Sequence, residues 1–178
     1  MAPRPGTVLV YDTTERQAPW LSRWWSLGSL ISQSETVVPA ASWADVYLAL
    51  GEHEGDVDLL QVWGHGNDGT PLIGGRTVSL GDLSSALQRT PATEVWWRSC
   101  EVHRGIAGQR FAERAVDILG CRSVGHCKVI SAPNPLRQSA ICGLYPGQTP
   151  WWPVDGAGLP GVWLTEMRVP ERAYREVS

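Results

Sequence analysis

The sequence predicts an α/β fold with a mainly parallel central sheet. Short apolar runs recur along the chain, and segments with helical patterning separate them. Strands that alternate with helices are typical of parallel sheets. Two of the runs are apolar over nearly their whole length, as strands covered on both faces are. A length of 178 residues with 43% hydrophobic residues suits a single domain over residues 1–178.

The first part of the chain is expected to hold two strands and a helix. Residues 7–12 form an apolar run that ends in an aspartate, and residues 35–38 form a second, shorter run. The Trp-rich segment 13–35 receives no assignment. Ser42 followed by Asp45 is a capping-box-like helix start.

The middle of the chain alternates between strand and helix. We expect a strand, a hairpin with a Gly-Gly turn, a helix, a strand and a helix, in that order, over residues 57–64, 71–78, 79–87, 93–99 and 105–119. Gly120 suits the position that ends the last of these helices. We expect the inner face of that helix to carry Ile106, Phe111, Ala115, Ile118 and Leu119.

The last part of the chain is richer in loops. A strand is expected over 122–130, broken near Gly125, and a last strand over 161–167. Between them, residues 132–161 are rich in Pro and Gly, a composition that suits a substrate-facing loop.

Charge and composition exclude several classes of function. The formal net charge of -3, without a long basic run, argues against nucleic-acid binding. We see no signal peptide and no apolar stretch of membrane-spanning length, so we expect a cytoplasmic protein. In that setting, we expect free thiols rather than disulfides for the cysteines, which are Cys100, Cys121, Cys127 and Cys142.

Two apolar runs end in reactive side chains. Residues 59–66 end in His65-Gly66, and residues 94–100 end in Ser99-Cys100. The carboxyl ends of parallel strands meet at one edge of a sheet, where ligands bind in open α/β folds. A cysteine nucleophile needs a neighbouring base, and histidine is the usual one. The pattern therefore predicts a thiol nucleophile with its base.

These two motifs resemble those of the caspase-like (clan CD) cysteine peptidases, in particular the bacterial CHAT and metacaspase-like members. The likeness covers residues 57–131, including the hairpin after Gly66 and the helix entry between Cys100 and Gly105. It implies a caspase-like three-layer sandwich with helices on both faces of the sheet. It also implies a cysteine endopeptidase that acts on protein or peptide substrates without a cofactor.

The resemblance implies a role for each motif residue. Cys100 is the expected nucleophile and His65 the general acid/base, and the backbone N–H groups of Gly66 and Cys100 form the oxyanion hole. The residue two before the cysteine, Arg98, lines the pocket for the substrate side chain before the cut. Peptidases of this fold are often regulated by protein partners, calcium or proteolysis, and no calcium-loop pattern is present.

The preference of that pocket stays open. A buried Arg98 favours an acidic residue through a bidentate pair. An internal carboxylate can instead neutralise it, and the candidates are Asp12, Asp155 and Glu101. Asp12 at the end of the first strand favours basic substrates if it lines the pocket itself.

Trp151 and Trp152 also allow two interpretations. Paired tryptophans usually pack into cores, which is the interpretation we favour. The alternative is that they form walls of a substrate groove carried by the 132–161 loop.

Two other functions compete with the peptidase. Caspase-like domains also act as catalytically silent binding or scaffold modules. A zinc-binding module is a weaker alternative, because its ligands would have irregular spacing. They would come from Cys100, His103, Cys121, His126, Cys127 and Cys142.

Overall fold

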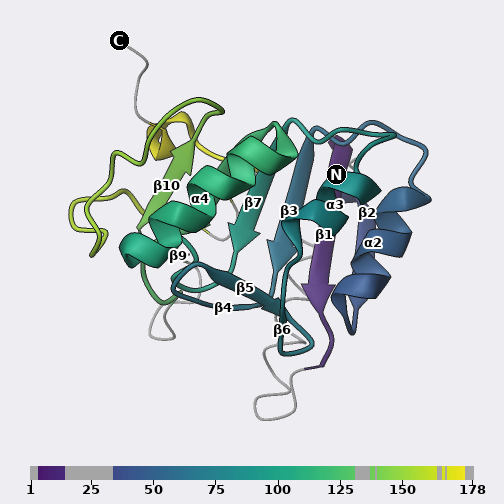
Figure 1. Cartoon of the computed structure of the whole chain (residues 1–178), viewed down its shortest axis with the longest axis horizontal. Coiled ribbons are helices and arrows are strands. Elements are labelled where there is room, and N and C mark those ends of the chain that lie inside the picture. The colour runs from purple at the N-terminus through teal and green to yellow at the C-terminus, as the bar shows by residue number, and fades with distance from the viewer. Residues whose placement is uncertain are drawn as a thin grey trace.

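Six strands form one mixed sheet in the order β2–β1–β3–β7–β8–β10 (Figure 1). The computed structural model describes residues 4–14, 34–130, 137–138, 140–163, 166 and 168–174. The first five strands in this order are parallel, and β10 runs antiparallel to β8. Their bounds are β1 Arg4–Asp12, β2 Ser34–Ala40, β3 Leu59–Trp63, β7 Glu94–Arg98, β8 Arg122–His126 and β10 Ile141–Leu144. The predicted α/β fold with a mainly parallel sheet is confirmed.

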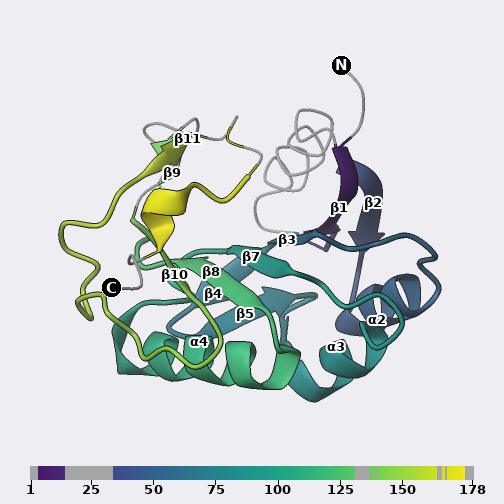
Figure 2. The same cartoon turned by 90° about the horizontal axis from the view of Figure 1, so that it is seen from above.

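Three α-helices cover one face of this sheet (Figure 2). They are α2 Trp43–Gly51, α3 Leu80–Ala86 and α4 Gly105–Leu119. The expectation of helices on both faces is not met within the described residues, because all three α-helices lie on the same face. The opposite face carries a two-stranded sheet and a short 3-10 helix, namely β9 Arg137–Gln138, β11 Val162–Trp163 and η1 Glu171–Ala173.

Local sequence signals explain where the helices start and stop. The Ser42 side chain accepts a hydrogen bond from the Asp45 backbone N–H, and the Asp45 carboxylate accepts from the Ser42 N–H, which completes the expected capping box. Helix α4 has the predicted bounds and ends at Gly120, which adopts φ 66°. That left-handed conformation suits glycine, which has no Cβ to clash.

The main core lies between the sheet and the three helices. Alternate strand residues point into it, as the pleat requires. From strands β1, β3 and β7 they include Val8, Val10, Leu60, Val62, Val95 and Trp97. The helices contribute Trp43, Val46, Leu83, Phe111 and Ala115 to the same cluster.

Some predicted details are wrong. In α4, Ile106 is 62% exposed and Ile118 is 40% exposed. Neither belongs to the inner face, which Ala112 and Val116 join instead.

Strand β8 is not broken at Gly125. A Cβ there would lie 2.6 Å from the His103 ring, so this glycine allows a close approach within a continuous strand. The region 132–161 also contains strand β10, which is short enough for the surrounding Pro and Gly to hide it in the sequence. Residues 15–33, in the segment without an assignment, lie outside the described residues.

Candidate active site

The two motif strands lie side by side in the sheet. Strands β3 and β7 are parallel and pair in register from Leu59 opposite Glu94 to Trp63 opposite Arg98. Both strands therefore end at the same edge of the sheet. His65 lies two residues after β3, and Cys100 lies two residues after β7. The expected meeting of the two motifs at the carboxyl edge is what the structure shows.

A small antiparallel sheet holds the histidine motif at this edge. It consists of β4 His65–Asn67, β5 Thr70–Ile73 and β6 Arg76–Thr77, and it lies across the carboxyl ends of the main strands (Figure 1). The hairpin predicted over 71–78 is thus part of a three-stranded sheet. His65 pairs with Leu72 in this sheet, and its side chain is half-buried.

Gly66 brings the two motifs into backbone contact. A Cβ on Gly66 would lie 2.4 Å from the carbonyl oxygen of Cys100 and 2.8 Å from the Cβ of Ser99. No side chain fits at that distance, so the His-Gly sequence is required for this close approach. The backbones of Gly66 and Cys100 are therefore neighbours.

The Cys100 thiol is half-buried and accepts a hydrogen bond. The Ile130 backbone N–H donates to Cys100 Sγ at 3.3 Å. Burial raises the pKa of the Cys100 thiol above its usual value, the Ile130 N–H opposes this rise, and the nearby Glu101 carboxylate adds to it. The resting site therefore holds mainly the protonated thiol at neutral pH, and attack on a substrate requires a base.

The residue after the cysteine has a strained backbone. Glu101 adopts φ 55°, a region that non-glycine residues rarely occupy. Its N–H donates to the Lys128 carbonyl, and its carboxylate pairs with Arg104, which also approaches Asp68 at 4.0 Å. Strain of this kind collects at functional sites. The sequence carries no signal for it, because any residue type can be forced into this conformation by its surroundings.

Arg98 lies buried between two tryptophans. Its guanidinium sits 3.7 Å from the Trp96 ring centre and 4.8 Å from that of Trp63. Arg98 Nη2 donates to the Glu166 carbonyl at 2.5 Å. Burial lowers the pKa of Arg98 to about 9, and the negative charge of Glu166 opposes that change.

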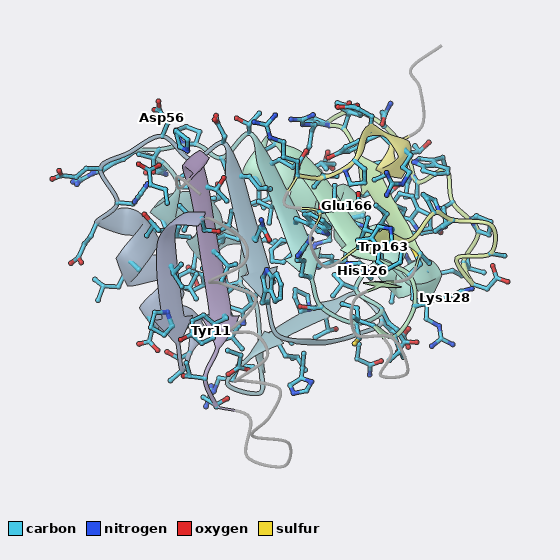
Figure 3. The ribbon with its side chains drawn as sticks, turned by 180° about the vertical axis from the view of Figure 1, so that it is seen from behind. Tyr11, Asp56, His126, Lys128, Trp163 and Glu166 are labelled. Carbon is cyan, nitrogen blue, oxygen red and sulfur yellow. The ribbon has the colours of Figure 1, made fainter. Side chains whose placement is uncertain are left out.

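Glu166 is not among the carboxylates that the sequence suggested as partners of Arg98. It lies with Trp163 and His126 on the face that α2, α3 and α4 leave uncovered (Figure 3). Its carboxylate also binds Arg172, at 2.7 and 2.8 Å. Because Glu166 is far from Arg98 in the chain, only the fold reveals this contact.

The Asp12 carboxylate holds two segments of the chain together. Its side chain is buried, and Oδ1 accepts hydrogen bonds from the backbone N–H and the hydroxyl of Thr14, both at 2.7 Å. Oδ2 accepts from the Gly74 N–H at 3.0 Å. The carboxylate therefore ties the turn between β5 and β6 to the end of β1.

The loop residues suggested for a groove take different positions. Trp152 is buried and stacks on His103, with ring centres 5.4 Å apart. Its Nε1 donates to the His103 carbonyl, so the core-packing interpretation applies to this residue. Trp151 is half-buried and donates to the Gly143 carbonyl, whereas Asp155 is exposed and accepts from the Ala157 N–H.

The described residues contain no group of three or more His, Cys, Asp or Glu side chains that could hold a metal ion. The zinc alternative therefore has no ligand set in this part of the chain. Among the same residues, no helix combines the length and the apolar character needed to cross a bilayer.

Comparison of the chain with protein-family models finds no match, and comparison with curated proteins finds none either. The fold and the site therefore define an α/β protein in which a histidine motif and a cysteine motif meet at the carboxyl edge of the sheet.

Proposed function

We propose that the chain is a caspase-like cysteine endopeptidase with Cys100 as nucleophile and His65 as general acid/base. One observation carries this proposal: Gly66, which follows His65, packs directly against the Cys100 carbonyl and the Ser99 side chain. That contact joins the two motifs at the carboxyl edge of a mainly parallel sheet, where ligands bind in such folds. The strained Glu101 beside the cysteine adds support.

In this mechanism, Cys100 Sγ attacks the carbonyl carbon of the scissile peptide bond. His65 accepts the thiol proton as the bond forms, because the raised pKa of Cys100 leaves little free thiolate at neutral pH. The N–H groups of Gly66 and Cys100 stabilise the negative charge on the oxygen. His65 then protonates the departing amine, and water hydrolyses the acyl-enzyme.

A catalytically silent caspase-like binding domain is the second candidate. The half-buried thiol with a raised pKa favours this alternative, since an unactivated cysteine is a weak nucleophile. The two candidates differ in one measurable property, which is turnover of a peptide.

The test is hydrolysis of a fluorogenic peptide library by the wild type and by Cys100→Ala and His65→Ala. The peptidase predicts cleavage that both substitutions abolish. Cys121→Ala and His53→Ala are matched controls outside the two motifs, and both should retain cleavage. Absence of cleavage by the folded wild type, with Cys100 inert toward a thiol-reactive probe, would favour the silent domain. The preferred residue before the cut reports whether Arg98 lines the pocket.

A further inference from the structure

Two buried thiols lie in contact beside the candidate site. Cys127 directly follows β8, and Cys142 belongs to the neighbouring strand β10. Their Sγ atoms are 2.8 Å apart, and neither side chain is exposed. We propose that Cys127 and Cys142 form a reversible intramolecular disulfide when the protein meets a low-molecular-weight disulfide.

The two cysteines are diagonal neighbours on paired strands, because Cys142 lies opposite Gly125, two residues before Cys127. The Cys127 N–H donates to the Ala140 carbonyl at 2.8 Å, which continues the pairing of β8 with β10. A disulfide bond is about 2.05 Å long, so the sulfurs need to approach each other by less than about 1 Å. The remaining cysteines are positioned differently, since Cys121 packs in the main core and Cys100 accepts from Ile130.

The His103 carbonyl keeps a hydrogen-bond donor after the cysteine thiols lose their protons. The Cys127 thiol donates to the His103 carbonyl at 3.4 Å, but Trp152 Nε1 donates to the same oxygen at 3.0 Å. Oxidation removes this weak Cys127 bond and the Cys142 bond to the Gly125 carbonyl at 3.8 Å, but the His103 carbonyl keeps its Trp152 donor. Burial raises the pKa of the Cys142 thiol, so the reaction speeds up as the pH rises.

A loop segment over residues 154–156 packs on Cys127. It gives a small disulfide a route to this thiol. A Cβ on Gly156 would lie 2.6 Å from the Cβ of Cys127, so this segment packs directly on the cysteine. Val154 in the same segment is 49% exposed, and its carbonyl accepts from the Gly105 N–H at 2.8 Å. We expect a small disulfide to reach Cys127 when this segment opens locally while β8 stays paired with β10.

The chemistry is an ordinary two-step exchange. The Cys127 thiolate attacks one sulfur of the small disulfide, which expels one small thiolate and leaves a mixed disulfide. The Cys142 thiolate then attacks the Cys127 sulfur and expels the second small thiolate. The protein loses two protons and two electrons, and the small disulfide is reduced to two thiols.

The test uses the folded full chain and oxidised glutathione at mildly alkaline pH. After incubation, the protein is unfolded in denaturant with excess alkylating agent, so that all free thiols react, and the peptides are mapped by mass spectrometry. We expect a peptide pair linked through Cys127 and Cys142, with Cys100 and Cys121 alkylated. Dithiothreitol should reverse the link, and the oxidised protein should melt several degrees higher than the reduced protein, because the link restricts the unfolded chain.

Substitutions sharpen the result. Cys121→Ala is the matched control and should still form the link, whereas Cys127→Ala should not. Because the wild-type mapping requires no variant, poor folding of Cys127→Ala would leave the test intact. Alkylation of all four cysteines after incubation, or glutathione retained on Cys127 without a link, would overturn the proposal. Neither result depends on peptidase activity, so this proposal and the proposed function fail separately.

Discussion

At the scale of single residues, the site depends on positions that carry little chemistry of their own. Gly66 allows the histidine strand to approach the Cys100 backbone, and the Ile130 N–H reaches the thiol. The proposed oxyanion hole also uses the Gly66 N–H, whereas Ile130 acts only through the Cys100 thiol. Gly66 determines how closely the two motifs approach each other, and the Ile130 N–H favours the thiolate form of Cys100.

Gly66→Ala should therefore destabilise the fold and disturb the site together. Its new Cβ would meet the Cys100 carbonyl at 2.4 Å, and overpacking of this kind costs about 1–3 kcal/mol. Gly81→Ala is the matched control, because a Cβ there meets nothing within 4 Å. Urea denaturation measures both variants. Equal stabilities for the two would contradict the close contact.

Ile130→Pro removes the backbone N–H that donates to Cys100 Sγ, whereas Ile130→Ala keeps it. Because the N–H stabilises the thiolate, its loss should raise the pKa of Cys100 further. Alkylation of Cys100 by iodoacetamide should become several-fold slower at neutral pH in the proline variant alone. The same rate in both variants would show that this hydrogen bond has no influence on the thiol.

At the scale of secondary structure, the small sheet β4–β6 positions His65, and Asp12 anchors it. The carboxylate accepts hydrogen bonds from Gly74 in the turn and from Thr14 beyond β1. This arrangement gives Asp12 a structural role at the edge where the sequence suggested a pocket residue. The distinction is measurable, because a structural residue affects stability and a pocket residue affects substrate preference.

Asp12→Asn should lower the free energy of unfolding by about 1–3 kcal/mol, since one of its buried hydrogen bonds loses its acceptor. The exposed Asp155 accepts a single backbone bond, and Asp155→Asn should change stability by less than about 0.5 kcal/mol. Chemical denaturation provides both values. A stable Asp12→Asn variant with a changed substrate preference would contradict the structural role.

Sequence patterns predicted elements whose signals are local. The capping box at Ser42, the glycine stop at Gly120 and the two apolar motif strands all follow from nearby residues. The contact of Arg98 with Glu166 and the strain at Glu101 depend on distant packing, which no local pattern encodes. The four-residue strand β10 was hidden because its flanking Pro and Gly residues suggest a loop.

At the scale of the whole molecule, the buried His103 links stability to pH. It is fully buried, stacks on Trp152 and lies between α4 and the β8–β10 edge of the sheet. Burial lowers the pKa of His103 from 6.5 to about 3. The folded protein therefore keeps this ring neutral at pH values where the unfolded chain binds a proton.

The sign of the effect follows from proton binding. The contribution of His103 is complete above pH 6.5 and is lost as the pH falls toward 3, by about 1.4 kcal/mol per pH unit. His103→Asn cannot take up this proton, so its stability should fall less steeply between pH 6.5 and 4.5 than that of the wild type. Urea denaturation at several pH values tests this. Parallel curves for the two proteins would show that His103 titrates as it does in the unfolded chain.

His65 and Cys100 are proposed to act as one catalytic unit. The most direct measurement is kcat/KM for peptide hydrolysis by the wild type, His65→Ala, Cys100→Ala and the double variant. If the two residues act together, each single substitution removes nearly all of the activity and the double variant is no worse. Losses that multiply in the double variant, or full activity in either single variant, would contradict the claim.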